Sequence, residues 1–186
     1  YEFYEDDFIF VEHSFLKIYD LNFTKGDPSK ALLGPDKLVI TESVAKKYFG
    51  NDDPIGKRLN LIGFSDLEVV GVIADLPHNT HLKFNMLCSF ETFKTFFANN
   101  PNFFDTQWVW VAAWMYFTVE DPIDVERIRE HLPEFVKAHY PEVLAEKGVA
   151  LHIQQADDIH LHSNLELEFK SNGNMQHVYI FSSIAV

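Results

Sequence analysis

The stretch Lys37-Leu-Val-Ile-Thr-Glu-Ser-Val-Ala-Lys-Lys-Tyr-Phe-Gly50 predicts a strand that leads directly into a helix. Three consecutive apolar residues, 38–40, suit a short buried strand. Thr41 is a good N-cap, and Glu42 lies in the first turn, where the helix dipole favours an anion. The apolar residues within 44–49 share one helical face, and Gly50 stands where helices commonly end. We therefore expect a strand over 37–40 and a helix that ends at Gly50.

Further strands are expected on both sides of this pair. Residues 8–11 are apolar and suit a short strand, and 15–21 suit a short helix. Residues 58–62 and 67–74 predict two strands, the second so continuously apolar that both of its faces should be covered. Gly71 within it indicates a bulge or a close backbone approach. The phenylalanines of 84–97 are partly at helical spacing.

The C-terminal half predicts a β-α-β unit. Residues 108–119 are rich in aromatic and β-branched types and predict a long strand. Asp121-Pro122 begins a helix with a capping Asp and Pro at its first position, and Pro133 must kink or restart it. Strands are expected at 149–154 and 158–161. Together these elements predict an α+β fold.

Composition and charge exclude several classes of protein. The chain has 186 residues, of which 47% are hydrophobic, and its net charge is −13. This acidity argues against binding to nucleic acid or to an anionic membrane face, since both require basic surfaces. The single cysteine, Cys88, excludes an intramolecular disulfide and a cysteine-based zinc site.

No catalytic or cofactor-binding motif is found in the sequence. Residues 50–57 resemble a phosphate-binding loop only superficially, because five residues separate the glycines and Arg58 follows the lysine. Nine histidines raise the question of a metal. His160 and His162 alternate on one face of an expected strand, directly after two aspartates, and two histidines with a carboxylate can bind zinc or iron. A structural role is favoured because spacing fixes no third ligand, so we predict no metal site; a metal-dependent hydrolase is the weakest alternative.

The aromatic residues of 108–119 are the most specific candidate for a binding surface. On a strand, Trp108, Trp110, Trp114 and Tyr116 share one face. Such a face can anchor a protein partner or stack on a sugar. Packing in the protein's own core is the more common use of such residues, so both interpretations stay open.

Several segments in the same order resemble one known family. They are Phe15-Leu-Lys-Ile-Tyr-Asp-Leu-Asn-Phe-Thr-Lys-Gly-Asp27, then 38–50, Asp53-Pro-Ile-Gly-Lys57, 67–75 and Pro77-His-Asn-Thr-His81. They resemble the MacB-like periplasmic core domain of permeases of the MacB/FtsX/LolC type of ABC transporter, and are most similar to those of Bacteroidetes-type bacteria. Residues 91–107 match no segment of the family.

The resemblance implies a division of the chain into three parts. Residues 1–35 and 108–165 would form a porter-like β-α-β part, and 36–107 an inserted smaller Sabre-like α/β subdomain. Residues 166–186, which end in an apolar run, would lead into a membrane helix.

It also implies a non-catalytic periplasmic domain of an inner-membrane protein. Such a permease forms a homodimer or heterodimer and pairs with a cytoplasmic ABC ATPase. ATP hydrolysis is then coupled to export of a periplasmic substrate or to activation of a periplasmic partner. The alternative is a soluble periplasmic module that binds a glycan or a protein through the aromatic face.

Overall fold

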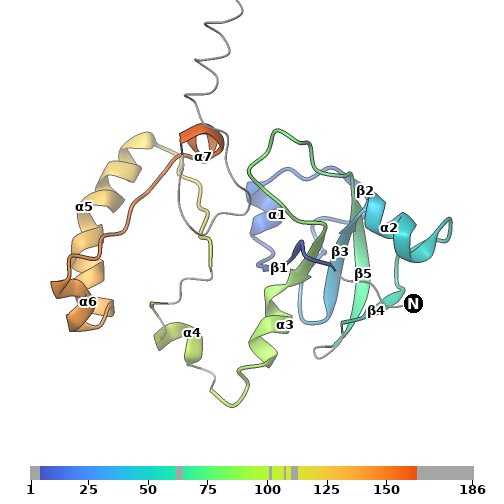
Figure 1. Cartoon of the computed structure of the whole chain (residues 1–186), viewed down its shortest axis with the longest axis horizontal. Coiled ribbons are helices and arrows are strands. Elements are labelled where there is room, and N and C mark those ends of the chain that lie inside the picture. Colours follow the sequence, from blue (N-terminus) through green and yellow to red (C-terminus); the bar gives the residue numbers. More distant parts are fainter. Residues whose placement is uncertain (1–4, 62–64, 101, 107, 110–112, 163–186) are drawn as a thin grey trace, which may run out of the picture. The chain divides into compact units, whose positions relative to one another are not determined.

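The computed structural model describes residues 5–61, 65–100, 102–106, 108–109 and 113–162, and the chain forms two compact units. Unit 1 is Tyr1–Pro101 and unit 2 is Asn102–Val186. Figure 1 shows that the sheet belongs to unit 1 and that the described part of unit 2 is helical. Each unit is described by itself.

Unit 1 is built on a six-stranded mixed sheet with the order β1-β6-β3-β5-β2, and β4 also pairs with β5. Its strands are β1 (Phe8–Val11), β2 (Phe23–Gly26), β3 (Lys37–Thr41), β4 (Arg58–Asn60), β5 (Asp66–Ile73) and β6 (Met86–Ser89). Two pairs are parallel, β1 with β6 and β3 with β5, and the others are antiparallel. Parallel and antiparallel pairs with accompanying helices confirm the predicted α+β class.

The strand and helix predicted for 37–50 are both present. β3 is followed at once by α2 (Glu42–Phe49), and the Thr41 hydroxyl accepts a hydrogen bond from the Val44 N–H at 3.4 Å. Gly50 follows the last helical residue with φ +62°. Glycine adopts this backbone conformation without strain, which is why the helix ends there.

The bulge predicted at Gly71 is confirmed. The register between β3 and β5 shifts at this point, so β5 carries an irregularity. A Cβ at Gly71 would lie 2.6 Å from the Phe23 ring of β2. The absent side chain therefore leaves room for this ring against β5.

The hydrophobic core lies at the centre of this sheet. β3, β5 and β6 supply most of it, and Val44 of α2 covers part of one face. The buried cluster contains Leu38, Ile40, Val44, Leu67, Val69, Val72, Met86 and Cys88. Sequence reasoning had not separated β6 from the helix that follows, because Phe84 and Phe90 suggested one helical segment.

Two short helices complete unit 1. α1 (Phe15–Ile18) follows β1, as predicted, and α3 (Phe90–Thr95) follows β6. The Ser89 hydroxyl accepts a hydrogen bond from the Glu91 N–H at 3.2 Å and thereby caps α3. Phe93 of α3 packs on Phe10 of β1, with ring centroids 4.9 Å apart.

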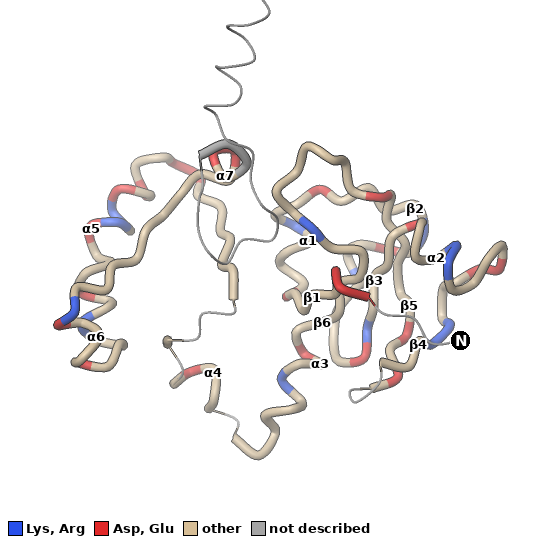
Figure 2. Tube along the Cα trace, in the orientation of Figure 1, with Lys and Arg blue, Asp and Glu red and all other residues tan. Residues whose placement is uncertain are grey.

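Unit 2 contains four helices among its described residues: α4 (Phe103–Thr106), α5 (Pro122–His139), α6 (Glu142–Glu146) and α7 (Ala156–His162). α5 begins as predicted, because the Asp121 carboxylate accepts a hydrogen bond from the Ile123 N–H at 2.9 Å and Pro122 is its first residue. The helix continues through Pro133 to His139. Acidic and basic residues are interspersed along α5 (Figure 2).

The predicted β-α-β unit is wrong in this part of the chain. Residues 113–119 and 149–154 are in no helix or strand, and the strand expected at 158–161 lies within α7. Asp157 and Asp158 lie in the first turn of α7, where carboxylates stabilise a helix. Helix formation therefore prevails over the short apolar alternation that had indicated a strand.

The two compact units separate between Pro101 and Asn102. β1 and β2, from 1–35, pair with β6 and β5, from 36–107, in a single sheet. The expected division into 1–35 with 108–165, 36–107 and 166–186 stays a prediction. The names porter-like and Sabre-like stay predictions, and the expected lead-in at 166–186 lies outside the described residues. Among the described residues, no helix is both long enough and apolar enough to cross a membrane.

Candidate functional site

The structure places the four predicted aromatic residues in different settings. Trp108 packs on α5, with its ring centroid 5.3 Å from that of Phe135 and 4.5 Å from that of His139. Trp110 lies outside the described residues. Trp114 and Tyr116 lie in 113–119, outside any strand, and Trp114 is 46% exposed. The common strand face is therefore not formed by the described residues, and a partner-binding role for these side chains stays a prediction.

The histidine pair is also placed differently from the prediction. His160 and His162 lie in helix α7 and not in the expected strand. Within the described part of the chain, no group of three or more His, Cys, Asp or Glu residues is arranged to hold a metal ion. The absence of a metal site at this pair stays a prediction.

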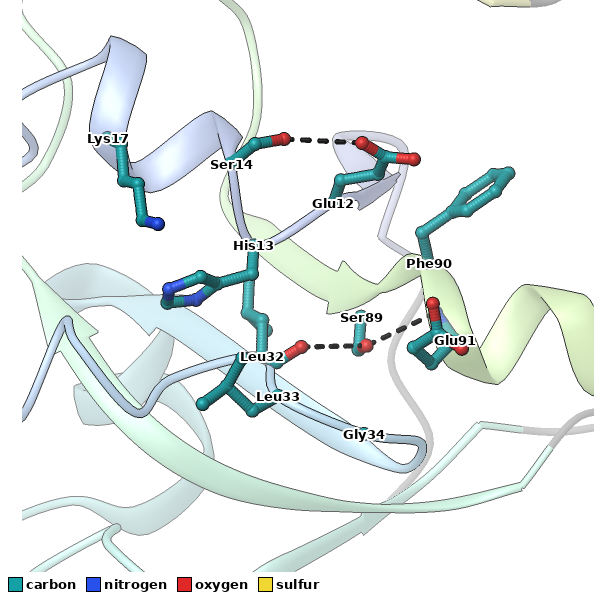
Figure 3. A pocket seen from close by; sticks show the side chains of 10 residues that line it. All are labelled: Glu12, His13, Ser14, Lys17, Leu32, Leu33, Gly34, Ser89, Phe90 and Glu91. Carbon is teal, nitrogen blue, oxygen red and sulfur yellow. Dashed lines mark hydrogen bonds between the residues drawn. The ribbon is translucent and has the colours of Figure 1, made fainter.

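Unit 1 contains a pocket that the sequence did not predict. It has a volume of about 410 Å³ and is lined by residues 12–14 and 17, by 32–34, and by 89–91. These come from the β1–α1 connection, the loop before β3 and the β6–α3 connection (Figure 3). The meeting of 32–34 with 89–91 is a tertiary feature that no local sequence pattern encodes.

Hydrogen bonds hold the pocket wall in place. The Ser89 hydroxyl donates to the Leu32 carbonyl at 3.0 Å, and His13 Nδ1 donates to the Ala31 carbonyl at 2.7 Å. These two bonds fix the loop although Leu32 adopts φ +61°, a conformation that is strained for a leucine. Leu32 is buried, whereas its neighbour Leu33 is 52% exposed.

The pocket combines charges of both signs with an apolar lip. Glu12 accepts a hydrogen bond from the Ser14 hydroxyl at 3.2 Å, and Glu91 pairs with Lys94 at 2.8 Å. His13 is oriented by a backbone carbonyl, and no hydrogen bond within the described pocket joins it to Ser14 or Ser89.

The single cysteine lies in the core beside this site. Cys88 is fully buried in β6. Burial raises the pKa of its thiol to about 11, although a hydrogen bond with Thr92 opposes the shift. Because the thiolate is the reactive form, Cys88 is inert in the folded protein.

Comparison with known proteins gives one family and several solved structures. The family model for the MacB-like periplasmic core domain matches residues 4–135. A solved domain from Porphyromonas gingivalis, described as belonging to a permease protein, is 25% identical with a TM-score of 0.53, and the match covers 75% of this chain and 61% of that one. None of the curated proteins matches the chain.

Two other solved structures are more distant. The extracellular domain of the noncanonic ABC-type transporter YknZ from Gram-positive bacteria is 24% identical, with a TM-score of 0.39 and coverage of 52% of both chains. The periplasmic region of MacB from Actinobacillus actinomycetemcomitans is 15% identical, with a TM-score of 0.41 and coverage of 69% of this chain and 54% of that one. The chain thus spans between 52% and 61% of the length of these solved chains.

Proposed function

Because the chain belongs to the MacB-like periplasmic core domain family, we propose that it acts as the extracytoplasmic coupling domain of an ABC transporter permease. In this role it is not an enzyme. It transmits motion driven by ATP hydrolysis in a cytoplasmic ATPase to the periplasmic side, where a substrate is exported or a partner is activated. The permease acts as a homodimer or heterodimer.

The family match is the observation that carries this proposal. Its range, 4–135, includes all six strands of unit 1, so the resemblance extends over a whole sheet and not over one motif. The Porphyromonas structure, described as a permease domain, is similar over 75% of this chain.

The packing of unit 1 is consistent with a domain that transmits displacement. Val39, Ile40, Val69, Leu87 and Cys88 have no exposed surface. Tightly packed interiors are barely compressible and therefore pass a displacement at one edge to the other. A loosely packed sheet would absorb the same motion.

Accessibility of the α2–β4 turn from outside the cell tests the location. In the full-length permease, Asp52→Cys introduces a thiol at an exposed position, since the Asp52 side chain is 77% exposed, whereas Cys88 is buried. A maleimide that cannot cross the inner membrane should label the variant in intact spheroplasts, and the unsubstituted permease serves as the control. Labelling only after lysis of the inner membrane would contradict the proposal.

The coupling role predicts a stable ATPase partner. Cross-linking of the full-length permease in native membranes, followed by mass spectrometry, should recover an ABC ATPase subunit. As a control, another ABC permease in the same membranes should be cross-linked to its own ATPase. If the control succeeds but this permease is recovered only as a dimer without an ATPase, the coupling role is contradicted and the proposed location is unaffected.

A further inference from the structure

The segment that precedes β1 makes its own contacts with the rest of unit 1, in addition to those of the short strand β1. β1 pairs with β6 over only four residues. Before it, the Asp7 carbonyl accepts hydrogen bonds from the N–H groups of Asn85 at 2.8 Å and Met86 at 3.3 Å. The Asp7 carboxylate also pairs with Lys83 at 2.9 Å. The chain is therefore fixed to the β6 side of the sheet before the strand begins.

Glu5 adds a second attachment that joins three separate segments. Its Oε1 accepts from Lys47 Nζ at 2.5 Å and from the Tyr48 hydroxyl at 3.0 Å, both in α2. Its Oε2 accepts from Asn85 Nδ2 at 2.9 Å, directly before β6. The Glu5 side chain is only 13% exposed. We call Glu5, Lys47, Tyr48 and Asn85 the Glu5 clamp.

The electrostatics of the Glu5 clamp favour an ionised Glu5. Burial raises the pKa of this carboxyl, but the three hydrogen bonds outweigh burial, so the pKa lies below its ordinary value. Burial and the Glu5 carboxylate together raise the pKa of Tyr48 to about 12, so its hydroxyl stays protonated and can donate. Lys47 supplies the opposite charge.

Glu5 sets the orientation of the Asn85 side-chain amide. Its buried Oδ1 has no hydrogen-bond partner in the part of the chain that the structure describes, whereas its Nδ2 faces the carboxylate. A carboxylate can only accept, so the amide must present its donor and leave its carbonyl unsatisfied. An unsatisfied buried carbonyl is retained here because the bond to Glu5 requires it.

We infer that the Glu5 clamp carries tension from the chain preceding β1 into the centre of the sheet. This inference rests on the proposed function, in which the domain transmits motion. From Glu5 one path leads through α2 to β3, which α2 follows directly, and the other leads through Asn85 to β6. β3 and β6 are neighbours inside the sheet, so the load bypasses the edge pairing of β1.

A double-mutant design tests the contact itself. Asn85→Asp places a second carboxylate against Glu5, so the two repel and the clamp opens. In the variant E5Q/N85D the introduced amide at position 5 donates to the introduced carboxylate, which restores the bond with donor and acceptor exchanged. Asp6→Asn removes one negative charge next to Glu5 without removing a hydrogen bond of the clamp, and serves as the matched control.

The measurement is the lifetime of the folded chain under constant force in optical tweezers. Handles are attached at residue 1 and at a cysteine introduced by Asp52→Cys. We expect N85D to shorten the lifetime of the first rupture about tenfold, and E5Q/N85D and D6N to stay within about threefold of the parent protein. Hydrogen exchange of β3 and β5 amides, unchanged in N85D, shows that the sheet is intact. An unchanged lifetime in N85D, or no recovery in E5Q/N85D, overturns the inference.

The outcome is separable from the proposed function. The tweezers experiment uses this chain alone, and its failure would leave the external labelling of the permease unaffected. If instead the force experiment succeeds and position 52 is labelled only after lysis, the clamp bears tension but the proposed location is wrong.

Discussion

Gly26 illustrates at the residue scale how a missing side chain determines strand pairing. It faces Gly71 across β2 and β5 and adopts φ +88°. A Cβ at Gly26 would clash with the Val70 carbonyl oxygen and lie 2.9 Å from the Gly71 Cα. Both the backbone conformation and the close approach therefore require glycine.

Gly26→Ala should destabilise unit 1 by about 3 kcal/mol or more, because backbone strain adds to a clash with main-chain atoms that cannot move aside. Gly34→Ala is the matched control: its φ is +81°, but nothing lies within 4 Å of the added Cβ. It should cost only about 1 kcal/mol. Urea unfolding followed by circular dichroism measures both, and equal losses would contradict the role of the close approach.

Residues whose roles are local were predictable from the sequence. Thr41, Gly50 and Asp121 act within a few positions of themselves, so their type and place indicate their function as caps. Asp36 was not predictable. It adopts φ +58° because its N–H donates to the Thr92 hydroxyl at 2.8 Å and its carboxylate accepts from Ser65, both distant in sequence.

At the scale of elements, α2 is stabilised by a second cap that follows β5. The Asp75 carboxylate accepts from the Ser43 N–H at 3.1 Å and from the Ser43 hydroxyl at 2.5 Å. The hydrogen bonds from Ser43 lower the pKa of Asp75 below its ordinary value, against a smaller effect of burial. The end of one strand thus fixes the start of the neighbouring helix.

Asp75→Asn should cost about 1 kcal/mol at pH 7, because a neutral amide oxygen accepts the two hydrogen bonds from Ser43 less strongly than a carboxylate near a helix N-terminus. A lowered folded-state pKa contributes stability that is present above the ordinary pKa of 3.8 and is lost as pH falls through the folded value. The variant should therefore lose less stability than the parent between pH 5 and pH 2. Urea unfolding across this range measures the difference, with Asp20→Asn as the control. Parallel pH profiles for D75N and the parent would contradict the cap.

The element predicted at 108–119 shows where periodicity misleads. Alternating aromatic and β-branched residues fit a pleated strand, but a strand also needs a partner for its backbone groups. Residues 113–119 have none among the described strands, and Trp108 packs on helix α5 instead. The side-chain pattern predicts which residues become buried, but it does not identify the element against which they pack.

At the scale of the molecule, every strand pairing of the described sheet lies within unit 1. The core cluster also lies entirely within residues 38–88. Because a compact unit with its own core can fold alone, a fragment of residues 1–101 should unfold cooperatively in urea, with the far-ultraviolet spectrum of a mixed sheet. A fragment that is unfolded in buffer would show that the sheet depends on residues 102–186. A fragment of 1–85, which lacks β6, is the negative control.

The class of the fold was predictable, whereas the order of its strands was not. Strands and helices alternate in 37–74 with clear caps and turns, and that local information suffices for an α+β assignment. The position of β1 beside β6 depends on long-range pairing, of which neither strand carries a local sign.

The pairing of β1 with β6 also has a consequence for synthesis. Phe8 pairs with Met86, so β1, which is synthesised before the other strands of the described sheet, gains its neighbour β6 last. Until then the apolar edge of the nascent domain stays uncovered, and closing so long a loop slows folding. A translation product that is truncated before β6 exposes that edge permanently. Such a product is therefore a substrate for chaperones and proteases. The sheet thus completes itself only when nearly all of unit 1 has been translated.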